Sequence, residues 1–270
     1  MGKKIIVANW KMYLTLRESV ALARRLAKLE IRPNAPEQGS VRGRNSKLEI
    51  VVCPSFVALE EVAKIVKKAP LKLGAQDVEP ERRGAYTGEV GLDDLKELGV
   101  QYVLVGHSER RRRGETDMLV NRKLKAVLAV DIRPILCVGE PWNVRRAKKE
   151  KQFVRVQIKA GLKGIPQKDW RRVVIAYEPV WAIGTDRADT PQDASEIHEW
   201  IRKSIIDIYG GRTSGQTEER PHVVPILYGG SVNPTNAHSF SQAPGVYGLL
   251  VGRASTSYSE FTDIVRSTTK

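Results

Sequence analysis

The chain has little of what a disulfide-rich or metal-binding protein needs. Its 270 residues include two cysteines, Cys53 and Cys137, and four histidines. No group of Cys and His residues has the spacing of metal ligands. Both cysteines end runs of β-branched residues, where a buried, reduced thiol is the ordinary expectation. We therefore expect no disulfide framework and no metal.

Long apolar runs are also missing. None approaches the ~20 residues that a membrane-spanning helix requires, and the mean hydropathy is −0.34. At the N-terminus, Asn9 and Lys11 interrupt the first apolar run before a signal-peptide core can form. We expect a cytoplasmic protein without a membrane partner.

Acidic residues are few relative to basic ones. The 31 Asp and Glu residues face 45 Lys and Arg residues, which gives a net charge of +14. Two runs, 110–113 and 145–151, hold much of the excess; they could simply be solvated helix faces. The positive field would attract anionic substrates. Aromatic residues make up only 6% of the chain, and none interleaves with the run 110–113 to stack on bases. We therefore expect electrostatic steering and no specific nucleic-acid partner.

Short β-branched runs alternate with longer amphipathic stretches along the whole chain. Periodicity predicts helices over 16–29, 119–129, 144–162 and 195–208. The predicted strands are Lys4–Asn9, Leu48–Cys53, Leu71–Ala75, Tyr102–Val105, Pro134–Val138, Val173–Tyr177, Val223–Leu227 and Gly248–Val251. Eight such units predict a single-domain α/β fold over residues 1–270, a closed (β/α)8 barrel. Two polar, glycine- and proline-containing segments, 32–47 and 210–221, are predicted to be surface insertions on the helix-to-strand side.

Reactive side chains and glycines follow the predicted strands. Because barrel enzymes work at the carboxyl ends of their strands, residues distant in sequence are expected to meet there. Glycine-rich turns after the seventh and eighth strands are typical of a barrel phosphate site, where backbone N–H groups bind an oxyanion. The residues in question are Asn9, Lys11, His107, Glu109, Glu178, Gly229, Gly230, Ser231 and Gly252.

Six segments, in this order, carry a specific resemblance: Asn9–Met12, Ala85–Glu89, Gly106–Arg111, Cys137–Glu140, Ala176–Thr185 and Tyr228–Val232. Together they resemble the triosephosphate isomerase family over nearly the whole chain, apart from the two insertions. The resemblance implies a cofactor-free aldose–ketose isomerase of glycolysis and gluconeogenesis. Its substrates would be glyceraldehyde 3-phosphate and dihydroxyacetone phosphate.

The resemblance also implies roles for individual residues. Glu178 would be the base that moves a proton between the carbons next to the carbonyl, a task favoured by a carboxylate in a dry pocket. His107 would be a neutral hydrogen-bond donor to the substrate oxygens. Lys11 would stabilise the developing enediolate, Asn9 would orient the substrate, and Glu109 would support the site.

Further residues would bind the phosphate or complete the site. The segment 179–185 resembles the family's lid, in which Gly184 would offer a backbone N–H to the phosphate. Ser231, Gly252 and Arg253 would complete the phosphate site. Thr87 would lie at the tip of a loop that inserts beside Asn9 and Lys11 of a second copy, which implies a homodimer.

Three residues depart from the family's usual pattern, and two other functions stay open. Asp186 and Arg253 stand where the family commonly has glycine, and Tyr247 stands where aspartate is frequent. A related isomerase for a four-carbon phosphosugar would need the same Glu, His and Lys. A polyanion-binding barrel without activity would explain the charge of +14.

Overall fold

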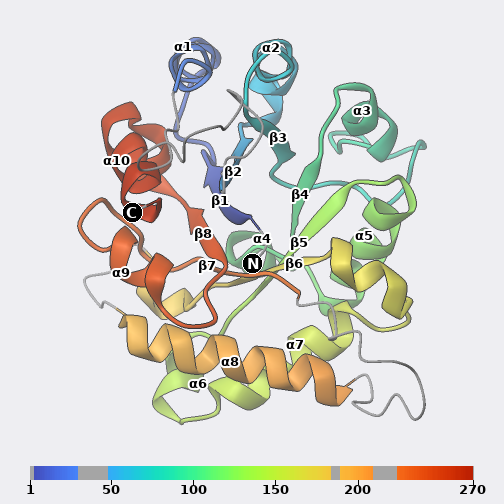
Figure 1. Ribbon diagram of the computed structural model, residues 1–270. Coiled ribbons are helices and arrows are strands. Elements are labelled where there is room, and N and C mark those ends of the chain that lie inside the picture. The colour runs from blue at the N-terminus through green and yellow to red at the C-terminus, as the bar shows by residue number, and fades with distance from the viewer. Residues whose placement is uncertain (1–2, 30–47, 184–188, 209–223, 270) are drawn as a thin grey trace.

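The computed structural model describes residues 3–29, 48–183, 189–208 and 224–269. Eight parallel strands form a closed barrel in chain order (Figure 1). Each strand pairs with the next, and the last pairs with the first, so Ile5 lies opposite Gly248. The predicted single-domain (β/α)8 barrel is confirmed. The strands are β1 (Lys4–Asn9), β2 (Leu48–Cys53), β3 (Lys72–Ala75), β4 (Tyr102–Val105), β5 (Arg133–Val138), β6 (Val174–Tyr177), β7 (Ile226–Tyr228) and β8 (Gly248–Val251).

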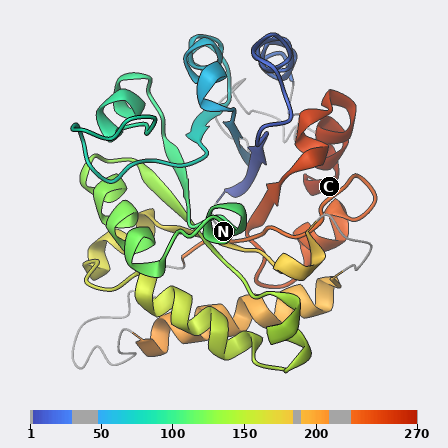
Figure 2. The same cartoon turned by 180° about the vertical axis from the view of Figure 1, so that it is seen from behind.

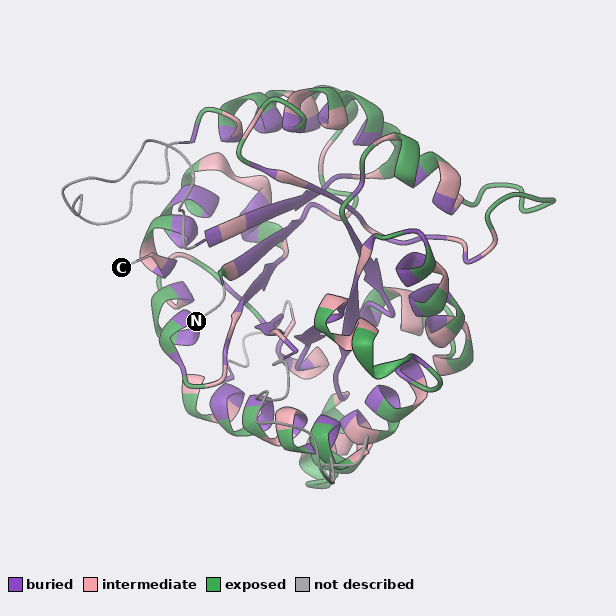
Figure 3. Ribbon diagram, turned by 45° about the vertical axis from the view of Figure 1, so that its right-hand side comes forward, coloured by how far each residue is buried: buried purple, intermediate pink, exposed green. Residues whose placement is uncertain are grey.

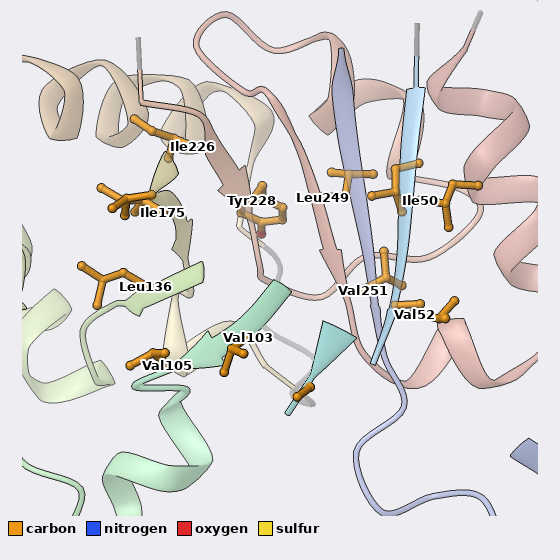
Figure 4. Packing of buried hydrophobic residues seen from close by; sticks show 14 of the residues in the cluster. Ile50, Val52, Val103, Val105, Leu136, Ile175, Ile226, Tyr228, Leu249 and Val251 are labelled. Atoms are coloured by element: carbon orange, nitrogen blue, oxygen red, sulfur yellow. The ribbon is translucent and has the colours of Figure 1, made fainter. Parts of the chain in front are cut away.

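Alternation along the strands builds two separate hydrophobic clusters. Side chains that point into the barrel form one cluster, made only of strand residues such as Val51, Leu104 and Ala176. Side chains that point outward pack against the helices in a larger cluster, part of which is shown in Figure 4. Successive strand residues face opposite sides of the sheet, so a barrel strand buried on both sides must be apolar throughout.

Helices surround the barrel, as the two opposite views show (Figures 1 and 2). Their inner faces are buried and their outer faces exposed (Figure 3). In α8, Ile197, Ile201 and Ile205 are buried, at the spacing of one helix face. The helices are α1 (Leu16–Leu26), α2 (Phe56–Val66), α3 (Leu92–Glu97), α4 (Ser108–Arg112), α5 (Asp117–Ala129), α6 (Trp142–Arg146), α7 (Glu150–Gly161), α8 (Pro191–Ile208), α9 (Ala237–Gln242) and α10 (Tyr258–Thr268), with short 3-10 turns η1 (Gln167–Arg172), η2 (Val180–Ala182) and η3 (Arg253–Thr256). None of these described helices is long and apolar enough to cross a membrane.

One predicted helix is wrong in an informative way. The stretch 144–162 forms two helices, α6 and α7, instead of one. Lys148 between them has a φ of 56°, a left-handed conformation that an α-helix cannot contain. After the break, α7 packs against β5 and between α5 and α8.

The predicted insertions, 32–47 and 210–221, lie outside the described residues. They fall between α1 and β2 and between α8 and β7, which are helix-to-strand connections. The extent of the domain over residues 1–270 therefore stays a prediction.

Candidate active site

His107 and Glu178 meet at the carboxyl ends of β4 and β6. His107 Nε2 lies 3.0 Å from Glu178 Oε1, and both side chains are buried. The other carboxylate oxygen accepts a hydrogen bond from the backbone N–H of Ser108 at 2.9 Å. Burial together with two donors fixes the direction in which the carboxylate points.

A hydrogen bond assigns the tautomer of His107. The residue is the N-cap of α4, and its Nδ1 accepts from the backbone N–H of Glu109 at 3.2 Å. A ring nitrogen that accepts a hydrogen bond carries no proton. The imidazole is therefore neutral, with its proton on Nε2, and donates toward Glu178. This is the form expected of a hydrogen-bond donor to a substrate oxygen.

Lys11 is fixed by contacts from three directions. Its ammonium lies 2.6 Å from Glu109 Oε1, its N–H donates to Asn9 Oδ1 at 3.1 Å, and its carbonyl accepts from Gln76 Nε2 at 2.8 Å. These contacts hold Lys11 at a φ of 50°, which costs a non-glycine residue about 1 kcal/mol. Sequence analysis did not single out Gln76, because it belongs to no recognised motif and looks like any polar residue after a strand.

The Glu109 carboxylate is tuned by the same lysine. Burial acts to raise the pKa of Glu109, but the hydrogen bond and charge of Lys11 outweigh it and hold the pKa below its ordinary value. Glu109 therefore remains an anion beside Lys11, and the ammonium keeps a defined position at the edge of the site.

Glycines leave room for the reactive side chains. A Cβ at Gly252 would lie 3.4 Å from Lys11 Cε, and one at Gly229 would lie 3.1 Å from Glu178 Cγ. At Gly139 it would come within 1.7 Å of the carbonyl oxygen of Glu178. Real Cβ contacts are almost never that close, so Gly139 is required wherever Glu178 has this backbone position.

Cys137 lies closer to the chemistry than its sequence context indicates. It belongs to the cluster inside the barrel, and its thiol interacts with the carboxylate of Glu178. Burial, followed by the charge of Glu178, raises the pKa of Cys137 well above its ordinary value. The thiol is therefore protonated and adds no negative charge next to the carboxylate.

The residues after Glu178 are tied to the end of β5. Glu140 is fully buried and accepts from the Tyr177 hydroxyl at 3.1 Å and from Trp181 Nε1 at 2.8 Å. Its carbonyl accepts from the backbone N–H of Val180 at 3.2 Å. Glu140 thus holds residues on both sides of Glu178, a role that sequence analysis missed.

Comparison with known proteins agrees with this geometry. The family model described as triosephosphate isomerase matches residues 4–268. The chain belongs to the triosephosphate isomerase family. The triosephosphate isomerase of Caldanaerobacter subterraneus subsp. tengcongensis is 43% identical over 266 residues, covering 98% of this chain and 99% of the relative. That of Dictyoglomus turgidum is 42% identical over 268 residues, covering 99% and 100%. That of Aquifex aeolicus is 41% identical over 266 residues, covering 98% and 99%.

The chain, as a member of the triosephosphate isomerase family, is an isomerase. Asn9, Lys11, His107, Glu109 and Glu178 come together at one end of the barrel through the contacts above. Gly252 joins them, because its Cα lies beside the Lys11 side chain. The part of the chain that the structure describes contains no group of three or more His, Cys, Asp or Glu side chains that could hold a metal ion.

The other predicted residues of this triosephosphate isomerase family member follow strands along the chain. Ser231 is exposed after β7, and its carbonyl accepts from Asn236 Nδ2 at 2.9 Å. Arg253 is exposed at the start of η3 and adopts no positive φ. Thr87 lies in a loop whose residues 82–89 are all exposed. Gly184 and Asp186 lie outside the described residues.

Proposed function

We propose that the enzyme interconverts glyceraldehyde 3-phosphate and dihydroxyacetone phosphate by proton transfer through an enediolate. The contact of His107 Nε2 with Glu178 Oε1 is the observation that carries this proposal. A buried carboxylate and an imidazole in contact support it, because such a pair could act on a carbon and on the oxygen bound to the neighbouring carbon. The reaction belongs to glycolysis and gluconeogenesis, and we propose that it takes place in the cytoplasm.

In this mechanism Glu178 removes a proton from the carbon next to the carbonyl and returns it to the adjacent carbon. The substrate replaces the direct contact between the two side chains, and His107 Nε2–H donates to the substrate oxygens instead. Through His107 the hydroxyl proton passes to the former carbonyl oxygen. Negative charge moves onto the enediolate oxygen, where the Lys11 ammonium opposes it. Asn9 orients the substrate, and Glu109 keeps Lys11 in place. Base, donor and counter-charge all come from the chain, so the proposed reaction requires no cofactor.

The phosphate is proposed to bind where β7 and β8 end. Ser231, Gly252 and Arg253 stand at these ends and would present backbone N–H groups, while Gly184 would contribute another. The position of Gly252 beside Lys11 supports this assignment, because the phosphate and the reacting carbons of a triose are separated by only a few bonds.

The active unit is proposed to be a homodimer. The Thr87 loop is exposed over residues 82–89, and large apolar side chains are exposed after neighbouring strands: Met12 by 91% and Val57 by 81%. A second copy that covered these side chains would remove them from water. It would also bring its Thr87 loop next to Asn9 and Lys11.

A coupled assay on the purified enzyme tests the function. Glyceraldehyde 3-phosphate should be converted to dihydroxyacetone phosphate, with no loss of rate after treatment with a chelator. A four-carbon aldose phosphate assayed in parallel should be turned over far more slowly. Turnover of the four-carbon compound alone, or heparin binding without any turnover, would support one of the two alternative functions instead.

A further inference from the structure

Arg145 lies between the two ends of the connection from β6 to α8. It belongs to α6. On one side its guanidinium carbon lies 5.3 Å from the centroid of the Trp181 ring, three residues after Glu178. On the other side its Nη2 lies 3.2 Å from Asp193 Oδ1, in the first turn of α8. One side chain therefore contacts both ends of this connection.

Three carboxylates interact electrostatically with this guanidinium. Besides Asp193, the charges of Glu140 and Asp189 act on Arg145. Glu140 is fully buried and bonded to Tyr177 and Trp181. Asp189 is 7% exposed; its Oδ1 accepts from the N–H of Thr190 at 3.1 Å, but its buried Oδ2 has no hydrogen-bond partner. Burial raises the pKa of Asp189, and the charges of Asp193 and Glu140 raise it further, because like charges repel one another unless a cation compensates them.

We propose that Arg145 is a positioning residue of the isomerase: by compensating Glu140, Asp189 and Asp193, it holds Trp181 and the start of α8 in the arrangement that fixes Glu178. This inference rests on the proposed function, because its readout is the turnover that depends on Glu178. The link to the base is short. Glu140 accepts hydrogen bonds from Tyr177, one residue before Glu178, and from Trp181, three residues after it.

The charge state of the cluster supports the proposal. Burial, followed by the charge of Asp193, raises the pKa of Asp189 to about 6, and Arg145 opposes this rise. Burial likewise raises the pKa of Glu140, against its hydrogen bonds and the charge of Arg145. Without Arg145, Asp189 and Glu140 should ionise only at higher pH. Once ionised, the two carboxylates would repel each other without a counter-charge.

In the part of the chain that the structure describes, three other titratable groups near the cluster carry no charge. Burial raises the pKa of Tyr177 on β6 and of Tyr228 on β7 well above the ordinary value. Burial lowers the pKa of His198, which contacts both tyrosine rings from α8, to about 3. Among the described residues, the charges around this guanidinium are therefore those of the three acids.

Turnover of Arg145 variants between about pH 6 and pH 9 tests the proposal. Arg145→Gln should lower kcat by about 10-fold at the alkaline end and by much less at the acidic end, with KM changed less than about 3-fold. Arg145→Lys, which keeps the charge, should stay within about 3-fold of the parent. Arg155→Gln is the matched control, because Arg155 also joins a neighbouring helix to α8, through Asp207 at 3.9 Å, away from the site.

A second substitution separates charge compensation from simple packing. Asp189→Asn added to Arg145→Gln removes one uncompensated carboxylate and should restore most of the lost kcat at alkaline pH. A packing role predicts a loss that is the same at every pH and is not restored by Asp189→Asn. That outcome, or an Arg145→Gln enzyme within about 2-fold of the parent at all pH values, would overturn the proposal.

Two further variants remove ambiguity. If Arg145→Gln does not fold, the same change is made together with Asp189→Asn and Asp193→Asn. Folding should return when the acids are gone, and failure to fold there would also overturn the proposal.

Glu178→Gln is measured in the same assay. If it stays fully active, the proposed function fails. If it loses activity while Arg145→Gln behaves like the parent at all pH values, only the inference about Arg145 fails.

Discussion

Glu178 Oε1 and His107 Nε2 lie 3.0 Å apart, so the proposed base and the proposed donor are in direct contact before substrate enters. The contact orients both groups. A bound substrate must separate them and make its own contact with each. Because a neutral imidazole donates to the carboxylate, the pair holds a single negative charge in a buried site. Any change that removes this charge should therefore affect proton transfer directly.

Replacing Glu178 with Gln should lower kcat by at least ~100-fold, as expected for loss of a positioned base. The amide has nearly the same shape, so the fold and the contact with Ser108 should persist. The coupled assay and a thermal melt, run side by side, separate the two effects. Full activity in this variant would contradict the proposed mechanism.

The buried carboxyl of Asp189 should make stability depend on pH. Its folded pKa is raised from 3.8 to about 6, chiefly by burial. The folded state therefore binds the proton more tightly than the unfolded chain, and stability is lost as pH rises from about 4 through about 6. Asp189→Asn should raise the free energy of unfolding by roughly 1–3 kcal/mol at about pH 8 and change it little at about pH 4.

Urea unfolding at the two pH values measures this effect. Asp263→Asn is the control, because Asp263 is 57% exposed and faces only Arg266 on its own helix; it should change stability by less than about 0.5 kcal/mol at either pH. Equal stabilisation by Asp189→Asn at both pH values would show that folding does not raise the pKa of this carboxyl.

Arg253→Gly should change KM by less than ~10-fold, which corresponds to about 1.4 kcal/mol. Arg253 is exposed and adopts no positive φ, so its side chain is dispensable for the turn, and the backbone N–H groups remain in the variant. Steady-state kinetics with glyceraldehyde 3-phosphate give the answer. A much larger rise of KM at constant kcat would identify the guanidinium as a phosphate ligand.

The positive charge of the chain should act on encounter with the substrate. With a net charge of +14, kcat/KM should fall as ionic strength increases, while kcat changes little, because screening weakens attraction of the anionic substrate before binding. A titration with a monovalent salt measures both constants. Sequence-specific nucleic-acid binding that persists at physiological salt would contradict this interpretation.

In light scattering, the purified protein should have twice the mass of the 30.2 kDa chain. Val57→Asp should weaken the dimer, because it places a charge on a side chain that is 81% exposed in the single chain and proposed to be covered by the second copy. Val156→Asp on α7, at 57% exposure, should leave the mass unchanged. A fully active monomer at micromolar concentration would rule out the proposal.

The sequence by itself determined the architecture and most of the reactive constellation. Strands buried on both sides must be apolar, so the β-branched runs marked all eight, with ends correct to within about three residues. The carboxyl ends of the strands meet at one rim. That is why Lys11, His107 and Glu178 could be grouped without coordinates, and why the family could be expected from short motifs.

Only the tertiary structure decided which groups support that constellation. Nothing local to Lys148 marked the break between α6 and α7, because its left-handed conformation depends on packing on either side. The interaction of Cys137 with Glu178, and that of Arg145 with three acids, join residues far apart in the chain. Their charge states depend on burial, which is a property of the folded molecule and not of any segment of its sequence.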